Sequence, residues 1–200
     1  MIDASTPPLG TIDAINQRRS VRAYSPARID QDTIHTLLAA AIRAPTAIHE
    51  EPWAFAIIQD VDALKRLSDL AKPIFLAEMQ RAHLDRGGHT LSQFASPDFN
   101  IFYNANTLIV ICGKSTARFA AADCWLAAEN LMLAACAVGL GTCIIGSAVS
   151  ALNNPELKIE FGIPRNMTAI APIIVGKPDA PAKPSARKAP QILSWKTSDN

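Results

Sequence analysis

The stretch from Phe119 to Val138 is the most apolar window of this 200-residue chain, and it restricts the fold more than any other segment. Its length would suit a membrane span, but Asp123, Glu129 and Asn130 interrupt it. A bilayer would leave these polar groups in hydrocarbon. The stretch therefore predicts a helix buried in a globular core, closed by Gly139, a residue type that commonly follows a helix C-terminus.

The rest of the chain mixes helical and extended patterns. Apolar residues recur every three or four positions across 30–43, which predicts an amphipathic helix with Asp30 as its N-cap. Further helices are predicted at 11–19, 62–70 and 155–161, and strands at 53–58, 108–112, 142–145 and 168–175. Residues 81–104 lack a sustained period and are predicted to form a mobile excursion, either a lid or a short helical pair. Periodicity alone thus indicates a mixed α and β protein.

The last residues differ in composition from the rest. A proline-rich stretch follows Gly176 and ends in an apolar patch with Trp195, and such a sequence cannot bury a core of its own. We expect one domain over residues 1–178 and an arm over 179–200 that wraps a partner subunit. A frayed tail is the alternative.

Composition excludes several classes of protein. Hydrophobic residues make up 49% of the chain, which excludes disorder of the whole chain. The net charge of +1 gives no global attraction to nucleic acid or to an anionic membrane. The four cysteines form no CxxC pair, so we expect buried free thiols in a reducing compartment. The N-terminus does not resemble a secretory signal, and we expect a cytoplasmic protein without a metal site.

Three motifs contain candidate binding residues. The first is RRSVR, with Arg18, Arg19, Ser20 and Arg22 at the point where a helix gives way to extended chain. Guanidinium groups and a hydroxyl are suitable donors for phosphate oxygens. Because successive side chains of an extended chain point to opposite sides, one short segment could bind a phosphate and also reach a ring. A solvated basic patch is the alternative. Arg187 in the arm is a second cation that could close the same phosphate site.

The other two motifs are loops. In APTAIHEEPW, Pro45 and Thr46 leave room for a flat ligand, and His49 is either a donor to that ligand or a surface residue. GLGTCIIGS lacks the glycine at Ile144 that a GxGxxG fingerprint needs, and it follows a helix rather than a strand. We therefore reject a dinucleotide-binding turn. Backbone N–H groups around Ile144, Ile145 and Gly146 could instead meet a flat ligand edge.

Together these blocks resemble the FMN-dependent nitroreductase family. RRSVRAY, APTAIHEEPWAF, AAENLMLAACAVGLGTCIIGS, FGIP, VGKP and a proline-rich tail with an arginine occur in the family's order over about residues 11–190. The resemblance implies an α+β fold, in which helices flank a central, mostly antiparallel sheet, and an intertwined homodimer with two sites at its interface.

The resemblance also implies roles for the motif residues. Arg18, Ser20 and Arg187 would hold the FMN phosphate with Arg19 beside them, and Arg22 would reach the ring near N1–O2. Pro45 and Thr46 would pack on the flavin from the neighbouring subunit, and the backbone of 144–146 would donate to N5. NAD(P)H would deliver hydride to N5 in a ping-pong reaction, and an electron-poor acceptor such as a nitroaromatic or quinone would then be reduced. No side chain is needed as a catalytic acid or base.

Two departures from the family pattern leave the substrate open. The family's loop reads close to PSxxNxQPW, whereas Thr46, His49 and Glu51 stand at the Ser, Asn and Gln positions. The sequence specifies neither the electron acceptor nor a preference for NADH or NADPH, and residues 72–104 carry no assignable motif. The opposing hypothesis is a flavin-binding storage or sensing protein without turnover. A third is a relative that cleaves its own flavin or dehalogenates an aromatic compound.

Overall fold

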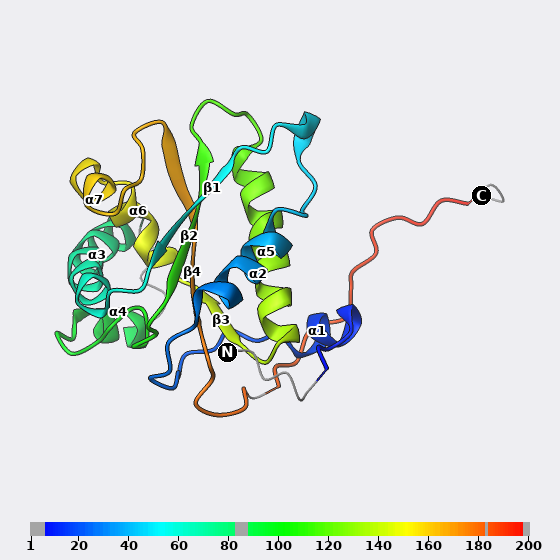
Figure 1. The fold of residues 1–200 in the computed structure, drawn as a ribbon, viewed down its shortest axis with the longest axis horizontal. Coiled ribbons are helices and arrows are strands. Elements are labelled where there is room, and N and C mark those ends of the chain that lie inside the picture. The colour runs from blue at the N-terminus through cyan, green and yellow to red at the C-terminus, as the bar shows by residue number, and fades with distance from the viewer. Residues whose placement is uncertain (1–6, 83–87, 183, 198–200) are drawn as a thin grey trace.

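The computed structural model describes residues 7–82, 88–182 and 184–197. Helices and strands are interspersed along the chain up to residue 176, and an extended arm follows (Figure 1). The elements, in chain order, are α1 (Thr11–Gln17), α2 (Gln31–Ala41), the 3₁₀ turn η1 (Ala47–His49), β1 (Trp53–Ile58), α3 (Val61–Arg81), α4 (Gly88–Ala95), β2 (Leu108–Lys114), α5 (Ala120–Ala137), β3 (Gly141–Ile144), the 3₁₀ turn η2 (Gly146–Ala148), α6 (Val149–Leu152), α7 (Pro155–Glu160) and β4 (Met167–Gly176).

The strands form one antiparallel sheet in the order β1-β2-β4-β3. Along β2, Leu108 and Val110 pack into one core cluster, whereas Ile109 and Ile111 pack into the other. This alternation is what a strand with both faces covered requires. The predicted α+β fold with a mostly antiparallel sheet flanked by helices is therefore confirmed.

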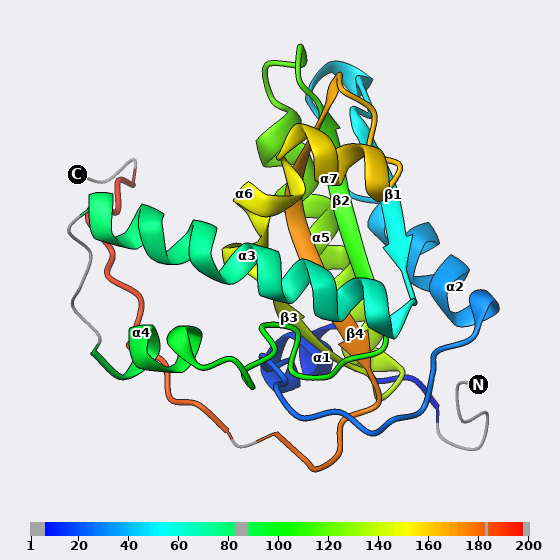
Figure 2. The same ribbon diagram turned by 90° about the vertical axis from the view of Figure 1, so that its left-hand side faces the viewer.

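Helices cover the sheet in two layers. α2 and α5 pack on one face with α1 beside them, and α3, α4, α6 and α7 lie on the other (Figures 1 and 2). α5 is the predicted core helix; its Cys124, Ala127, Ala128 and Leu131 are fully buried against the sheet. No helix in the described ranges is long and apolar enough to cross a membrane.

Capping residues predicted from the sequence are in place. The side chain of Asp30 accepts a hydrogen bond from the Thr33 N–H at 2.7 Å, so it caps α2 as expected. Gly139 follows α5 with a φ of +77°, a backbone conformation that L side chains rarely adopt. The boundaries of these two helices were therefore readable from local chemistry.

The segment 72–104 differs from the prediction. α3 continues for eleven residues beyond 70, through Pro73, to Arg81, and α4 follows at Gly88–Ala95. Residues 96–102 are bound to α3 by hydrogen bonds from Lys72 and to Ser68. In the described part of 81–104 the structure has one helix, α4, and a turn bound to α3, rather than a pair of short helices; residues 83–87 lie outside the described ranges.

One edge of the sheet is only half covered by a strand. β3 pairs with residues 173–176 of β4 and then ends. Beyond it the Ile145 N–H donates to the Pro172 carbonyl at 2.8 Å. The side-chain amide of Asn153 both donates to the Ala169 carbonyl and accepts from the Ala169 N–H, each at 2.9 Å. Asn153 therefore satisfies the backbone that a fifth strand would otherwise pair.

Candidate functional site

The RRSVR segment runs along the outer edge of β3. Ser20 forms a parallel bridge with Thr142, and the Val21 N–H donates to the Thr142 carbonyl at 2.9 Å. Val21 is buried, whereas Ser20 and Arg22 on either side of it are exposed. A Cβ at Gly141 would lie within 2.9 Å of the Val21 side chain. A glycine at this position lets the segment dock closely, and docking fixes where Ser20 and Arg22 point.

Positive charge gathers at this edge. Arg22, Ser20 and Arg18 all interact with the Cys143 thiol on β3 and oppose the rise in its pKa that burial causes. Arg18 also lies 3.7 Å from a carboxylate oxygen of Glu129 on α5. The structure therefore brings three of the predicted phosphate and ring contacts to one place.

Arg19 has a different role from its neighbours. Its Nη1 donates to the carbonyls of Asn16 and Arg18 at 2.7 Å each, at the C-terminal end of α1. A cation is favourable there because the last carbonyls of a helix lack intrahelical donors. Its Nε is buried without a hydrogen-bond partner. Arg19 thus fixes the helix end from which the binding residues extend.

A cavity of about 660 Å³ opens beside this segment. Arg18, Arg19, Arg28 and Lys177 line it, and none of the described lining residues is acidic. A cavity of this size whose charged groups are all cations suits an anionic ligand of nucleotide size.

The loop after β3 offers one accessible backbone position. The Ile145 N–H is already bonded to Pro172, and the Ile145 side chain is buried. Gly146 is exposed, and a Cβ placed on it would meet no atom within 4 Å. Of the three positions predicted to meet a flavin edge, Gly146 is therefore the one a ligand can approach most closely, with Ile144 half-buried beside it.

The second predicted loop is held in an unusual conformation. Ile48, His49 and Glu51 all have φ between +43° and +56°, which is costly for residues with a Cβ, above all for β-branched isoleucine. The Ala47 N–H donates at 3.2 Å to Oδ1 of Asp123, which is buried in the first turn of α5. Pro45, Ile48 and His49 are exposed. The fold thus presents this loop outward at some conformational cost.

The predicted site residues are not all close together within one protomer. The loop 45–51 is tied to the start of α5, while Ser20 pairs with Thr142 just beyond its end (Figure 1). The 18 residues of α5 separate them by roughly 27 Å at 1.5 Å per residue. Arg187 lies on the arm, which extends away from the body, and it bonds only to its neighbours Ser185 and Ala186 among the described residues.

Several residues of the site had no sequence signal of their own. Asp123 interrupts an apolar helix, which argues against a membrane span but does not indicate a contact with the 45–51 loop. Its Oδ2 is buried without a hydrogen-bond partner. Tyr103 lies with its ring centroid 5.9 Å from the Arg22 guanidinium carbon, a contact between distant segments that no local pattern encodes. No group of three or more metal-ligating side chains occurs in the described part of the chain.

The cysteines give a prediction that depends on pH. All four are free, and Cys112, Cys124 and Cys143 are buried as expected, whereas Cys136 is only half-buried. Burial raises the pKa of Cys112 to about 11 and that of Cys124 to about 12, from a usual value of 9.0. These two thiols contribute stability that is complete below pH 9 and is lost as the pH rises through those values.

We therefore expect the free energy of unfolding to fall between pH 9 and pH 12, and to fall less in a Cys112→Ala/Cys124→Ala variant. Urea titrations at pH 8, 10 and 11 measure both slopes. Equal slopes in the two proteins would show that these thiols do not contribute.

Comparison with known proteins agrees with this geometry. The model of the nitroreductase family matches residues 15–177. An Archaeoglobus fulgidus protein provisionally named NADH dehydrogenase/NAD(P)H nitroreductase is 29% identical over 169 residues, covering 82% of this chain and 83% of that protein. The FMN reductase [NAD(P)H] of Bacillus subtilis is 25% identical, covering 88% of this chain and 68% of its own length. A nitroreductase from Bacteroides fragilis, solved with bound FMN, superposes with a TM-score of 0.79 at 26% identity and covers 94% of this chain and all of its own.

Proposed function

Because the chain belongs to the nitroreductase family, we propose that it is a homodimeric, FMN-binding oxidoreductase that passes electrons from NAD(P)H to an electron-poor acceptor such as a nitroaromatic or a quinone. The observation that carries this proposal is the cationic edge formed by Arg18, Ser20 and Arg22 against β3. It occurs beside a cavity lined by cations, in a fold shared with a nitroreductase solved with FMN.

The residues at this edge suit FMN. Arg18 and Ser20 would hold its phosphate through charge-assisted hydrogen bonds, and Arg22, one alternation further along the extended chain, would face the ring. The exposed Gly146 backbone would lie against the flavin edge. When bound, FMN supplies the two-electron chemistry. The protein positions it and places positive charge beside it, so no side chain is proposed as a catalytic acid or base.

A second copy of the chain would complete the site. An exposed stripe on α5 contains Trp125 and Leu126, each more than two-fifths exposed, and α1 adds the exposed Ile12 and Ile15. Apolar surface of this extent on a helix is typical of an interface. If α5 packs antiparallel to its copy about a two-fold axis, the 45–51 loop of one protomer meets the cationic edge (Arg18, Ser20 and Arg22) of the other. The strained, outward-facing loop then contacts the partner's flavin.

The proposal is tested by the absorption spectrum of the purified protein before and after anaerobic NAD(P)H. A flavin spectrum that is bleached by NAD(P)H and restored by a nitroaromatic is the expected result. Bound flavin that stays oxidised would favour the storage or sensing hypothesis. Absence of flavin binding, even after reconstitution with FMN, would contradict the proposal itself. A halogenated phenol as the second substrate tests the dehalogenase alternative in the same cuvette.

We expect Arg18→Ala and Arg187→Ala each to weaken FMN binding. A charge-assisted hydrogen bond to phosphate contributes about 1.5–3 kcal/mol, so the loss is on the order of tenfold to a hundredfold in Kd. Flavin fluorescence titration of the apoprotein measures it. Arg66→Ala is the matched control, because Arg66 forms a comparable surface ion pair with Glu160 at 3.1 Å but belongs to the opposite face. Parental affinity in both test variants would overturn the phosphate assignment.

A further inference from the structure

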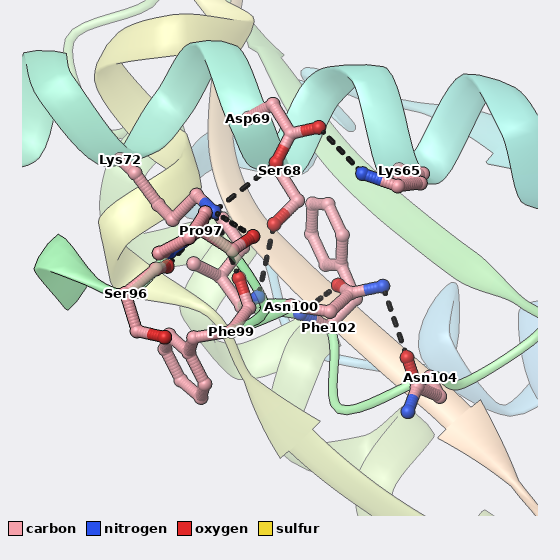
Figure 3. A network of polar contacts seen from close by, with 11 residues as sticks. Lys65, Ser68, Asp69, Lys72, Ser96, Pro97, Phe99, Asn100, Phe102 and Asn104 are labelled. Carbon is pink, nitrogen blue, oxygen red and sulfur yellow. Dashed lines mark hydrogen bonds and ion pairs between the residues drawn. The ribbon is translucent and has the colours of Figure 1, made fainter. Parts of the chain in front are cut away.

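Lys72 is a buried cation with an unusual set of partners. Its side chain lies on the inner side of α3, and the residue is 7% exposed. The ammonium donates to the carbonyls of Ser96, Pro97 and Phe99 at 3.3, 3.2 and 3.0 Å, and it lies 3.1 Å from Oδ1 of Asp69 (Figure 3). Lysine is almost never this buried unless its charge is paired. Here the pairing is made mostly by the backbone of another segment.

These contacts define the path of the segment 96–104. Three carbonyls of one turn point at a single ammonium group, so the turn cannot shift without losing several hydrogen bonds together. A second attachment lies next to it, where the Ile101 N–H donates to Oγ of the buried Ser68 at 3.0 Å (Figure 3). An apolar side chain at position 72 could fill the same space, but it would not specify where the carbonyls lie.

The segment that Lys72 holds ends in a strained turn. Tyr103 and Asn104 have φ of +51° and +57°; asparagine tolerates this conformation, but tyrosine keeps it only when the surroundings enforce it. The rings of Phe99 and Tyr103 meet edge to face at 5.6 Å. Both rings line a cavity of about 430 Å³ that also contains Arg22, Asn100 and Asn104. The anchored segment thus forms an aromatic wall beside the arginine expected at the flavin ring.

We propose that Lys72 is a positioning residue for the electron acceptor: it holds residues 96–104 so that Phe99 and Tyr103 form a binding surface for a planar aromatic acceptor next to Arg22. Aromatic rings pack edge to face or offset on one another, and the amides of Asn100 and Asn104 can donate to nitro or quinone oxygens. This inference rests on the proposed function, since it takes Arg22 as the flavin contact.

The test compares Lys72→Met with Lys65→Met in the FMN-loaded protein. Lys65 lies on the same helix and pairs with the other oxygen of Asp69 at 2.8 Å, but it is exposed, and it interacts with the segment through the charge of Asp98 rather than through a hydrogen bond. For Lys72→Met we expect faster amide hydrogen exchange across 96–104 and a roughly tenfold higher KM for 4-nitrobenzamide. The rate with ferricyanide, which needs no aromatic surface, and the Kd for FMN should stay at parental values. Lys65→Met should resemble the parent in all four measurements.

The outcomes separate this inference from the proposed function. A parent that binds no flavin, or whose flavin NAD(P)H does not reduce, contradicts the function. A parent that turns over, with faster exchange in Lys72→Met but an unchanged KM for the nitroaromatic, overturns the positioning role. An equal loss with both acceptors also overturns it, because the defect would then be general. If Lys72→Met does not fold, Ser68→Ala replaces it, because this variant removes the hydrogen bond to the Ile101 N–H of the same segment. The KM values for the two acceptors are then compared in the same way.

Discussion

Deletion of residues 179–200 is expected to remove flavin, dimer and thermal stability together. The arm makes few contacts with its own body, and its apolar residues Ile192, Leu193 and Trp195 are mostly exposed, Leu193 to 90%. Such residues need a surface to cover, and we propose that this surface belongs to the partner subunit. The deletion also removes Arg187 and with it one expected contact to the FMN phosphate.

Loss of a partner and of a ligand that bind only the folded chain lowers its apparent stability, and we expect a fall in Tm of about 5–10 °C. Analytical ultracentrifugation, flavin absorbance and thermal melts of the truncated chain measure the three effects. Arg187→Ala in the full chain is the control: it should lose flavin affinity and remain dimeric. A truncated chain that is yellow, stable and monomeric would refute this role of the arm.

The second large effect is the recovery of flavin sites by mixing two defective variants. Arg18→Ala damages the Ser20 edge, and Thr46→Trp blocks the loop that would contact the partner's flavin. Each homodimer then has a defect in both of its sites. In a mixed dimer one site combines two intact halves and the other combines two damaged ones, so about one site in two is expected to be restored in the mixed dimers.

Co-expression of the two variants with different affinity tags, followed by flavin quantification in the doubly tagged fraction, measures this recovery. FMN is kept below the Kd of the Arg18→Ala protein so that only complete sites fill. Two copies of the same variant with different tags form the control. If both halves of each site came from one chain, no mixed dimer would exceed its parents, and the shared site would be disproved.

Local chemistry explains which parts of the fold could be predicted. The Asp30 cap, the glycine after α5 and the apolar strands each depend on residues that are neighbours in sequence, so their patterns are readable. α3 was predicted too short because Pro73 and the charged Lys72 resemble the end of a helix. Lys72 is compatible with a buried position only because carbonyls 24 to 27 residues away surround it. These hydrogen bonds of Lys72 are made with a distant segment, so the sequence around Lys72 does not indicate them.

The candidate site was predictable in its parts but not in its assembly. RRSVR marked the cationic edge because arginine and serine suit phosphate wherever the chain places them. Nothing in the motif shows that Arg19 closes a helix end while its neighbours face outward. Ile48, Glu51 and Tyr103 are left-handed although their side chains disfavour this conformation, so propensity argues against what tertiary contacts impose. The separation along α5 between the 45–51 loop and the cationic edge at Ser20 also could not be predicted from the sequence.

The half-covered edge of β4 has a consequence for aggregation. An exposed strand edge is a template for non-specific pairing between sheets and therefore for aggregation. In this chain Pro172 presents no N–H, and the Asn153 amide occupies both hydrogen-bonding groups of Ala169. Backbone pairing with another strand is therefore blocked along this part of β4. In the proposed dimer, recognition between the two copies would depend on the side chains of α5 rather than on backbone pairing at this edge.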